Sequence, residues 1–484
     1  MKSAVVLAMV CAFLGFARPS EAALGVGVAD NTLLGSPDGG ASFLSLMNDV
    51  GLRQLRLPVR WDPARPARIE HEAEIRALLP AAAVRGVTVA FSIQGTNAQA
   101  LSSPQAPAQL APFLQKLARS FPTVKDVIVG NEPNQPRFWQ PQFDPGGANV
   151  SAGRYEALLA TSYDALKAVD PEIDVIGLGL SSRGNDNPNA SGNVSTSPVR
   201  FLLELGAAYR GSGRTRPLMD ELAYHPYPRR DTDSLTEGFL WPNAGVTNLG
   251  RIKQAFWDAF HGTGQPTFEA GLQMRLDEVG WQVSVPRGSL HAYFGRETVQ
   301  PTTEARQAAI YSSLVRYAAC DSTVDALLFF GLRDEPNLSR WQAGLMRANG
   351  TPRRSYVAVK TVLEQTGGHC VGKMRGWRHS TKVVGASARF ATARRLPSRV
   401  RSWSFLASAG EDAAFDAGIY RWRGRLGARV RSETGRLEAQ VLRYVRFPSK
   451  RLAPGRYVYS IHFRADANEG RTTRKTSRPF VVHR

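Results

Sequence analysis

The sequence predicts a (β/α)8 barrel of the TIM-barrel type, an α/β fold, followed by a small all-β sandwich. Short apolar strands alternate with amphipathic helices from Leu24 to Thr366, which is the pattern of a parallel sheet. No Gly-rich phosphate fingerprint follows any strand, which disfavours an open doubly wound sheet. After Cys370 the helical period disappears and short strands separated by turns follow, which favours a sandwich.

Eight strand–helix pairs account for the first region, with long loops on one face. The expected strands are 24–29, 52–59, 87–93, 125–129, 173–178, 219–223, 274–278 and 324–331. The expected helices are 40–50, 70–83, 107–120, 152–169, 198–209, 249–261, 303–319 and 354–366. In the second region the expected strands are 399–405, 417–422, 437–445, 456–463 and 479–482.

The first 23 residues have the layout of a secretory signal peptide. Lys2 precedes an apolar run over 4–16, and small residues follow, so we expect cleavage after Ala22 or Ala23. The alternative, a membrane anchor, needs a longer apolar run. We therefore expect an exported, extracellular protein without a transmembrane segment, with the barrel over 24–368 and the sandwich over 369–484.

Charge separates the two regions. Residues 370–484 contain 26 Lys and Arg against 7 Asp and Glu, so nearly all of the net charge of +20 lies there. Such a surface is suited to anionic cell-wall or cell-surface polymers. Arg421, Arg425 and Arg431 belong to an alternating stretch that is consistent with the cationic face of an edge strand. The alternative is an ordinary solvated basic surface, and export makes nucleic acid an unsuitable partner.

Two cysteines remain after removal of the signal peptide, Cys320 and Cys370. In an exported chain they are expected to form a disulfide, although two separate thiols are the alternative. Cys320 precedes the eighth strand and Cys370 follows the eighth helix, so both lie at the lower face of the barrel. We therefore favour a disulfide that closes the barrel.

The fourth strand ends on Asn131-Glu132-Pro133. Pro133 should bias Glu132 towards extended backbone. The carboxyl ends of barrel strands are where reacting groups gather. A second carboxylate, Glu278, ends the seventh strand, and strand alternation puts Leu276 and Glu278 on one face and Asp277 on the other.

Two carboxylates facing each other across a barrel mouth suit hydrolysis of a glycosidic bond, one protonating the leaving oxygen and the other attacking the anomeric carbon. The alternative is a pair of structural carboxylates on a non-catalytic carbohydrate-binding or cell-surface barrel. No His/Cys cluster has zinc spacing and no Gly-x-Ser-x-Gly elbow occurs, so metal and serine chemistry are poorly supported.

These motifs resemble those of clan A glycoside hydrolases, the cellulase-like retaining enzymes. The resemblance rests on Asn131-Glu132-Pro133, on Glu278-Val279-Gly280-Trp281, on Arg56 in the second strand and on His225-Pro226-Tyr227 after the sixth. It implies that Glu132 is the acid/base, that Glu278 is the nucleophile, and that β-linked sugars are cleaved without a metal or organic cofactor. One departure is the lack of a histidine over residues 92–97, where many members carry one. A transglycosylase is a close variant.

The same resemblance implies supporting roles. Asn131 would hydrogen-bond the sugar 2-hydroxyl, Arg56 would stabilise the charged form of Glu278, and Tyr227 would orient it with His225 nearby. Ordinary ion pairing or packing is the alternative for each. Trp281, Trp139 and Trp341 are expected either to stack on sugar rings or to pack. The basic second region resembles the immunoglobulin- or fibronectin-like modules of secreted proteins in pattern only.

Overall fold

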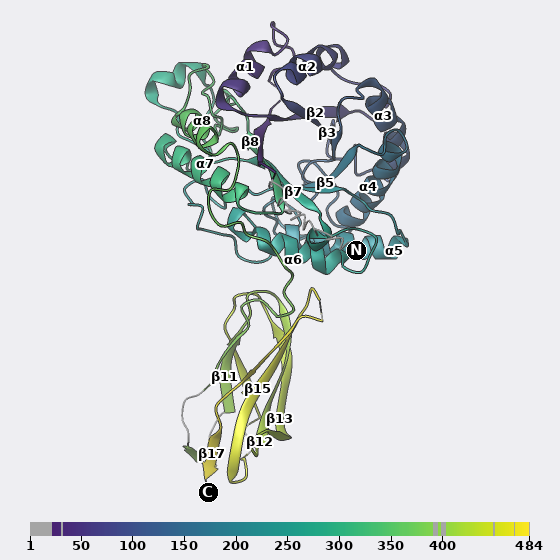
Figure 1. Cartoon of the computed structure of the whole chain (residues 1–484). Helices are drawn as coiled ribbons and strands as arrows, with labels where there is room; N and C mark the ends of the chain where they lie inside the picture. Colours follow the sequence, from purple (N-terminus) through teal and green to yellow (C-terminus); the bar gives the residue numbers. More distant parts are fainter. Residues whose placement is uncertain are drawn as a thin grey trace, which may run out of the picture.

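The structure, a computed structural model, describes residues 22–30, 32–390, 395–397, 403–448, 451–468 and 470–483. Figure 1 shows a barrel ringed by helices and an elongated all-β region attached to it through one connection. Nearly all of the expected signal peptide, residues 1–21, lies outside the described residues. In the described part, no helix combines the length and apolarity needed to cross a membrane.

The eight strands of the first region are parallel and close into a barrel in chain order, with β1 pairing both β2 and β8. This confirms the predicted fold class. The strands are β1 (Gly25–Ala29), β2 (Gln54–Trp61), β3 (Thr88–Gly95), β4 (Asp126–Val129), β5 (Asp174–Ser181), β6 (Glu221–His225), β7 (Gln273–Val279) and β8 (Val324–Phe330).

A helix follows each strand and covers the outside of the barrel (Figure 1). The helices are α1 (Ala41–Val50), α2 (Glu72–Val84), α3 (Ala106–Ser120), α4 (Ser151–Lys167), α5 (Pro198–Ser212), α6 (Leu249–Phe260), α7 (Glu304–Ala319) and α8 (Arg354–Thr366). Short 3-10 turns η1 (Val246–Asn248), η2 (Phe268–Ala270) and η3 (Arg287–Ala292) lie in the connections. Gly367 ends α8 with φ 58°, a conformation that glycine adopts without strain.

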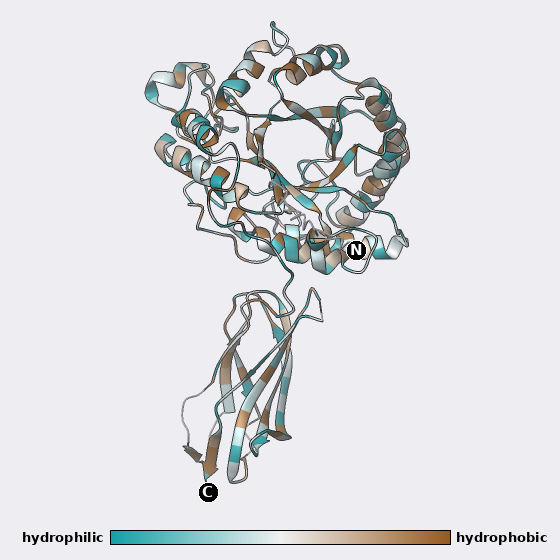
Figure 2. Cartoon of the chain, in the orientation of Figure 1, coloured by the Kyte–Doolittle hydropathy of each residue, from teal (hydrophilic) through white to brown (hydrophobic). Residues whose placement is uncertain are grey.

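Strand alternation divides the buried side chains into two sets. Outward-facing residues such as Leu276 and Leu222 join the large apolar core between strands and helices. Inside the barrel, Ala90, Ile128, Ile176 and Ala223 form a separate small cluster. Figure 2 shows hydrophobic residues both along the barrel strands and along the helices. The barrel is therefore filled by its own side chains, and polar groups at its upper end sit on an apolar layer.

A buried ion-pair group occupies the lower end of the barrel interior. Arg275 on β7 donates to Asp126 at 2.8 Å and to Glu221 at 3.2 Å, at the first residues of β4 and β6. Outside the barrel at the same end, Cys320 and Cys370 form a disulfide. The amino ends of the strands are thus fixed by charge pairing and a covalent bond, as expected of the face that maintains stability.

The second region consists of two sheets. One has the order β10 (Arg395–Pro397), β17 (Phe480–His483), β15 (Gly455–Ala465), β12 (Ala413–Trp422), β13 (Leu426–Leu437), with β16 (Thr472–Thr476) pairing β15. The other has the order β14 (Arg443–Phe447), β11 (Trp403–Ser408), β9 (Ser387–Arg389). Apolar side chains of both sheets share one core, which includes Trp403, Phe405, Ile419, Ile461 and Phe463.

Two expectations for this region were wrong. The strand predicted at 437–445 is in fact the end of β13, a loop and the start of β14. The arginine-rich stretch is not one strand: β12 ends at Trp422, a turn with Gly424 at φ 80° reverses the chain, and β13 begins at Leu426. Alternation alone does not reveal a tight hairpin, because it continues through the turn.

The two regions are joined by a buried ion-pair group and by a partly exposed ion pair. Arg471, on the loop after β15, lies 2.9 Å from Asp258 of α6 and 2.6 Å from Glu411, and the side chains are almost fully buried. His379 in the connection lies 2.7 Å from Glu269 of the barrel. Because a buried charge without its partner is costly, the junction is specific in geometry.

Candidate active site

The chain turns sharply at the end of β4. Gly130 has φ 88° and Glu132 has φ 42°, a left-handed conformation. The expectation that Pro133 keeps Glu132 extended is therefore wrong. The Glu132 N–H donates to the carbonyl of Gly179 at 3.0 Å, so a contact with β5 outweighs the local preference. Such strain in a non-glycine residue is typical of functional sites.

The end of β7 carries a bulge. Leu276 pairs with Leu327 and Val279 with Phe329, so β7 advances three residues while β8 advances two. The extra residue breaks the alternation, and Asp277 and Glu278 both reach the barrel interior. The prediction that Asp277 faces away from Glu278 is therefore wrong, because a bulge re-aims the following side chain.

Arg56 projects from β2 to the centre of the site. Its Nη1 donates to Glu278, and its Nη2 donates to the side-chain oxygen of Asn131 at 2.5 Å. Its Nε lies 3.0 Å from Oδ2 of Asp277. The side chain is buried, so the planar fork is fixed by these three partners. One guanidinium thus joins residues that end β4 and β7.

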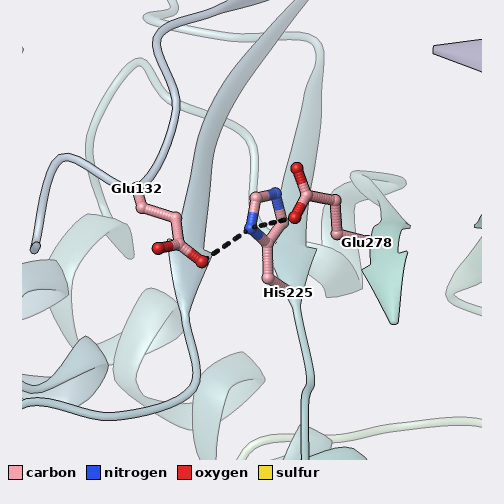
Figure 3. A group of neighbouring side chains, drawn as sticks. All are labelled: Glu132, His225 and Glu278. Carbon is pink, nitrogen blue, oxygen red and sulfur yellow. Dashed lines mark hydrogen bonds and ion pairs between the residues drawn. The ribbon is translucent and has the colours of Figure 1, made fainter. Parts of the chain in front are cut away.

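His225, the last residue of β6, lies between the two glutamates (Figure 3). Its Nδ1 is 3.0 Å from Oε1 of Glu132 and 3.6 Å from Oε2 of Glu278. Its Nε2 is 3.2 Å from Oδ1 of Asp277. The imidazole is fully buried, so its ring contacts a carboxylate at both nitrogens.

The two glutamate side chains are largely buried. The side chains of Glu132 and Glu278 are 13% and 11% exposed. One oxygen of each lies within 4.8 Å of the other and of a His225 nitrogen. Tyr227, just after β6, donates its hydroxyl to Oε2 of Glu278 at 3.1 Å. The structure therefore brings together Asn131, Glu132, His225, Tyr227 and Glu278, together with Arg56, as the sequence predicted.

The charges of the site stabilise one another. Burial by itself would lower the pKa of His225, but the negative Glu278 and Asp277 outweigh it and raise the pKa to about 10. Burial likewise opposes ionisation of Asp277, yet His225 and Arg56 hold its pKa below the ordinary value. The pKa of Tyr227 is raised well above its usual range by burial and by Glu278. At neutral pH the site therefore contains an imidazolium and a neutral phenol.

Glu132, His225 and Glu278 offer three atoms at distances that a metal ion could bridge. A metal requires the neutral imidazole, with a free lone pair on nitrogen. His225 is instead held in its protonated form, with a carboxylate at each ring nitrogen. The donor set does not fit a resident cation, and the group is better described as a network of ion pairs.

Only one of the three tryptophans can reach a ligand. Trp341 is half-buried and packs beside Tyr227, with ring centroids 4.9 Å apart. Trp139 and Trp281 are each 1% exposed, against Tyr155 and Tyr311. Sugar stacking by Trp139 and Trp281 is therefore contradicted, since neither ring has a free face. Their position after β4 and β7 did not distinguish packing from binding.

Asp277 is the main residue that sequence reasoning missed. It was assigned to the opposite face of β7, whereas its carboxylate lies beneath the site against two cations. Gly179 is a second residue that sequence reasoning missed. A side chain there would crowd the imidazole, because a Cβ at this position would lie 3.2 Å from Nε2 of His225. The adjacency of Asp277 and Glu278 at the end of a strand could have suggested that both acids belong to the site. No local sequence feature predicts the bulge that allows both side chains to face the interior.

No family model matches the sequence, and no curated protein matches it either. Among solved structures, it is similar to a family 39 glycoside hydrolase from Bacteroides cellulosilyticus WH2, with 15% identity over 88% of this chain and 81% of that one, at a TM-score of 0.49. A glucosidase from Croceicoccus marinus is similar at 13% identity over 90% and 94% of the chains, with a TM-score of 0.49.

A family 39 β-xylosidase from Caulobacter crescentus is 16% identical over 82% of this chain and 83% of that one, with a TM-score of 0.46. At these identities and TM-scores the likeness does not transfer an activity to this chain.

Proposed function

We propose that the protein is a retaining glycoside hydrolase that cleaves O-glycosidic bonds, of β configuration, in a poly- or oligosaccharide. The observation that carries the proposal is the pair Glu132 and Glu278, whose oxygens approach within 4.8 Å at the barrel mouth. Retaining enzymes hold their two carboxyl groups about 5–5.5 Å apart, whereas inverting enzymes leave about 6.5–9.5 Å for a water molecule. The separation favours double displacement.

The surroundings assign the two roles. Glu278 is held by the Arg56 guanidinium and the Tyr227 hydroxyl, which stabilise a carboxylate and fix its orientation. Glu278 is therefore the nucleophile. Glu132 lies across the mouth at the end of β4 and serves as acid and then as base.

The reaction then takes two steps. An oxygen of Glu278 attacks the anomeric carbon while Glu132 gives its proton to the leaving oxygen, so that the glycosidic bond breaks and a glycosyl ester forms. In the second step Glu132 takes a proton from water, the hydroxide oxygen bonds to the anomeric carbon, and Glu278 leaves as a carboxylate. Configuration is inverted twice and so retained.

Two further residues would contact the sugar. The side-chain oxygen of Asn131 accepts from Arg56, which leaves its NH₂ group to donate to a 2-hydroxyl, a contact that strengthens in the transition state. The half-buried ring of Trp341 beside Tyr227 offers an apolar platform for a sugar ring. Interception of the glycosyl ester by another sugar would give transglycosylation at the same site.

The test is labelling with 2-deoxy-2-fluoro glycosides that carry activated leaving groups, over a panel of sugars. Trypsin releases residues 276–287, and fragmentation distinguishes Glu278 from the adjacent Asp277. We expect the sugar mass on Glu278, and none in the matched variant Glu278→Gln. A label on another residue refutes the assignment. No label with any sugar, together with equal polysaccharide binding by wild type and Glu278→Gln, supports the non-catalytic binding protein instead.

We also propose that the protein is exported. Residues 1–23 have a signal-peptide layout, and the Cys320–Cys370 disulfide suits an oxidising compartment. Expression of the full chain in an exporting bacterium should yield an extracellular protein that begins at Ala23 or Leu24. Recovery of only the full-length chain inside the cell contradicts this.

We further propose that the basic β region holds the enzyme on an anionic polysaccharide. β13 and β14 are edge strands of their sheets and lie against each other. Arg436, Arg443 and Arg446 are exposed there, and charge complementarity favours a polyanion. The double variant Arg443→Glu/Arg446→Glu should elute from an immobilised polyuronate at a lower salt concentration than wild type. The control variant Arg119→Glu, on the barrel, should elute at the same salt concentration as wild type. Identical elution of all three proteins indicates an ordinary solvated surface.

A further inference from the structure

Asp277 has no access to substrate, yet it contacts both cations of the site. Its side chain is 0% exposed, with Oδ2 at 3.0 Å from Nε of Arg56 and Oδ1 at 3.2 Å from Nε2 of His225. In each cation the nitrogen nearest Asp277 is distinct from the nitrogens that contact Glu132, Glu278 or Asn131. Asp277 therefore supports both cations from below.

Two local features place the Asp277 carboxylate beneath the site. Asp277 faces inward by alternation with Arg275, and the bulge between Leu276 and Val279 brings Glu278 to the same interior. On the other side, a Cβ at Gly179 would lie 3.2 Å from Nε2 of His225 and 4.0 Å from Oδ2 of Asp277. Close packing of this kind favours direct ion pairs over solvation.

We propose that Asp277 is a positioning residue that sets the net charge of the ionic groups around the two glutamates. These groups, Arg56, His225 and Asp277, are called the frame below. The inference rests on the proposed double displacement. Arg56 and His225 contribute two positive charges and Asp277 one negative charge, so the frame has a net charge of +1. Before attack, Glu278 is anionic and Glu132 holds a proton. In the glycosyl-enzyme, Glu278 is a neutral ester and Glu132 is the anion.

The glutamate pair thus carries a net charge of −1 in both states, and the frame of +1 balances it in both. Without Asp277 the frame would be +2 and would favour ionisation of both glutamates, so the acid would lose its proton at lower pH. Without His225 the frame would be 0 and would favour retention of the proton. The groups that face His225 are Glu132, Glu278, Asp277 and Tyr227, with Arg56 behind the shared carboxylates.

The test is a double-mutant cycle of Asp277→Asn and His225→Gln, assayed as the pH profile of kcat/KM on the aryl glycoside that wild type cleaves best. The alkaline limb reports loss of the acid's proton. Asp277→Asn should move this limb to lower pH by about one unit, the size that one adjacent charge produces, and His225→Gln should move it to higher pH. The double variant restores a frame of +1, so its limb should return close to that of wild type.

Asp321→Asn is the matched control. Asp321 is a buried carboxylate paired with Lys253 at 2.7 Å, just before β8 at the lower face. Its loss should lower stability without moving the pH profile. If Asp277→Asn alone does not fold, comparison of His225→Gln with the double variant still measures the effect of Asp277. Limbs that coincide in all variants overturn the proposal.

A readout independent of turnover separates this inference from the proposed function. In ¹⁵N-labelled protein, the His225 imidazolium should lose its proton at lower pH in Asp277→Asn than in wild type. If no glycoside is cleaved, the proposed function fails, and this titration still tests the role of Asp277. Equal titration of His225 in the two proteins refutes that role.

Discussion

Replacement of His225 by Gln should remove a pH-dependent part of the stability of the barrel. The pKa of His225 is about 10 in the folded protein against 6.5 for the unperturbed side chain. Between these values the folded state binds a proton that the unfolded state releases. The contribution is therefore complete below about pH 6.5 and is lost as the pH rises towards 10.

The size of the effect follows from the same difference in pKa. At about 1.4 kcal/mol per pH unit, the linked free energy is about 4–5 kcal/mol for this fully buried group. An independent guide is the cost of removing one partner from a buried ion pair, about 3–5 kcal/mol. Either value is a large share of the roughly 5–15 kcal/mol that separates folded from unfolded protein.

The assay is urea unfolding of wild type and His225→Gln between pH 6 and 10, with hydrogen exchange of peptides from β6 and β7 to isolate the transition of the barrel. The difference in unfolding free energy should be largest near pH 6 and should shrink steadily towards pH 10. A difference that does not vary with pH would mean that His225 is neutral in the folded protein. That result would refute the description of the site as an ion-pair network.

Other changes should have distinct effects. Glu132→Ala should lower turnover of alkyl glycosides about 10²–10⁴-fold, and azide, which needs no base, should restore turnover of an activated aryl glycoside; azide without effect contradicts the role. Cys320→Ser should lower the unfolding free energy by about 3–4 kcal/mol in denaturant titrations, because it opens a disulfide with a sequence separation of 50. Arg471→Ala should cost about 3–5 kcal/mol of stability and leave kcat/KM unchanged. Trp139→Ala should cost about 3–5 kcal/mol through a cavity, whereas Trp341→Ala should raise KM at little cost in stability.

Sequence periodicity alone was enough to predict the barrel and the strand ends that carry Glu132 and Glu278. Apolar runs of five to eight residues alternate with amphipathic helices, and that periodicity is local, so each strand was placed within a few residues. Glu132 and Glu278 were identified because each follows such a run, and the carboxyl ends of parallel strands meet at one face. The disulfide partners, Cys320 and Cys370, followed from the same topology.

Local sequence patterns predicted the strand boundaries of the β region less accurately. The expected strand 417–422 ends with β12, but the alternation of arginine with other residues continues through the turn at Gly424, so the stretch from Arg421 to Arg431 was interpreted as the face of one edge strand. The predicted strand 437–445 crosses a loop for the same reason. A strand boundary that lacks Pro or a Gly pair is decided by pairing with a neighbouring strand.

Tertiary structure decided the electrostatics of the site. The left-handed turn at Glu132 depends on a hydrogen bond to Gly179 of β5, and the inward position of Glu278 beside Asp277 depends on how β7 pairs with β8. The burial of Trp139 depends on packing against α4. Each involves residues far apart in the chain, whereas periodicity reports only on neighbours in sequence. The sequence therefore pointed to Glu132 and Glu278, and only the closed barrel placed His225 between them and Asp277 beneath His225 and Arg56.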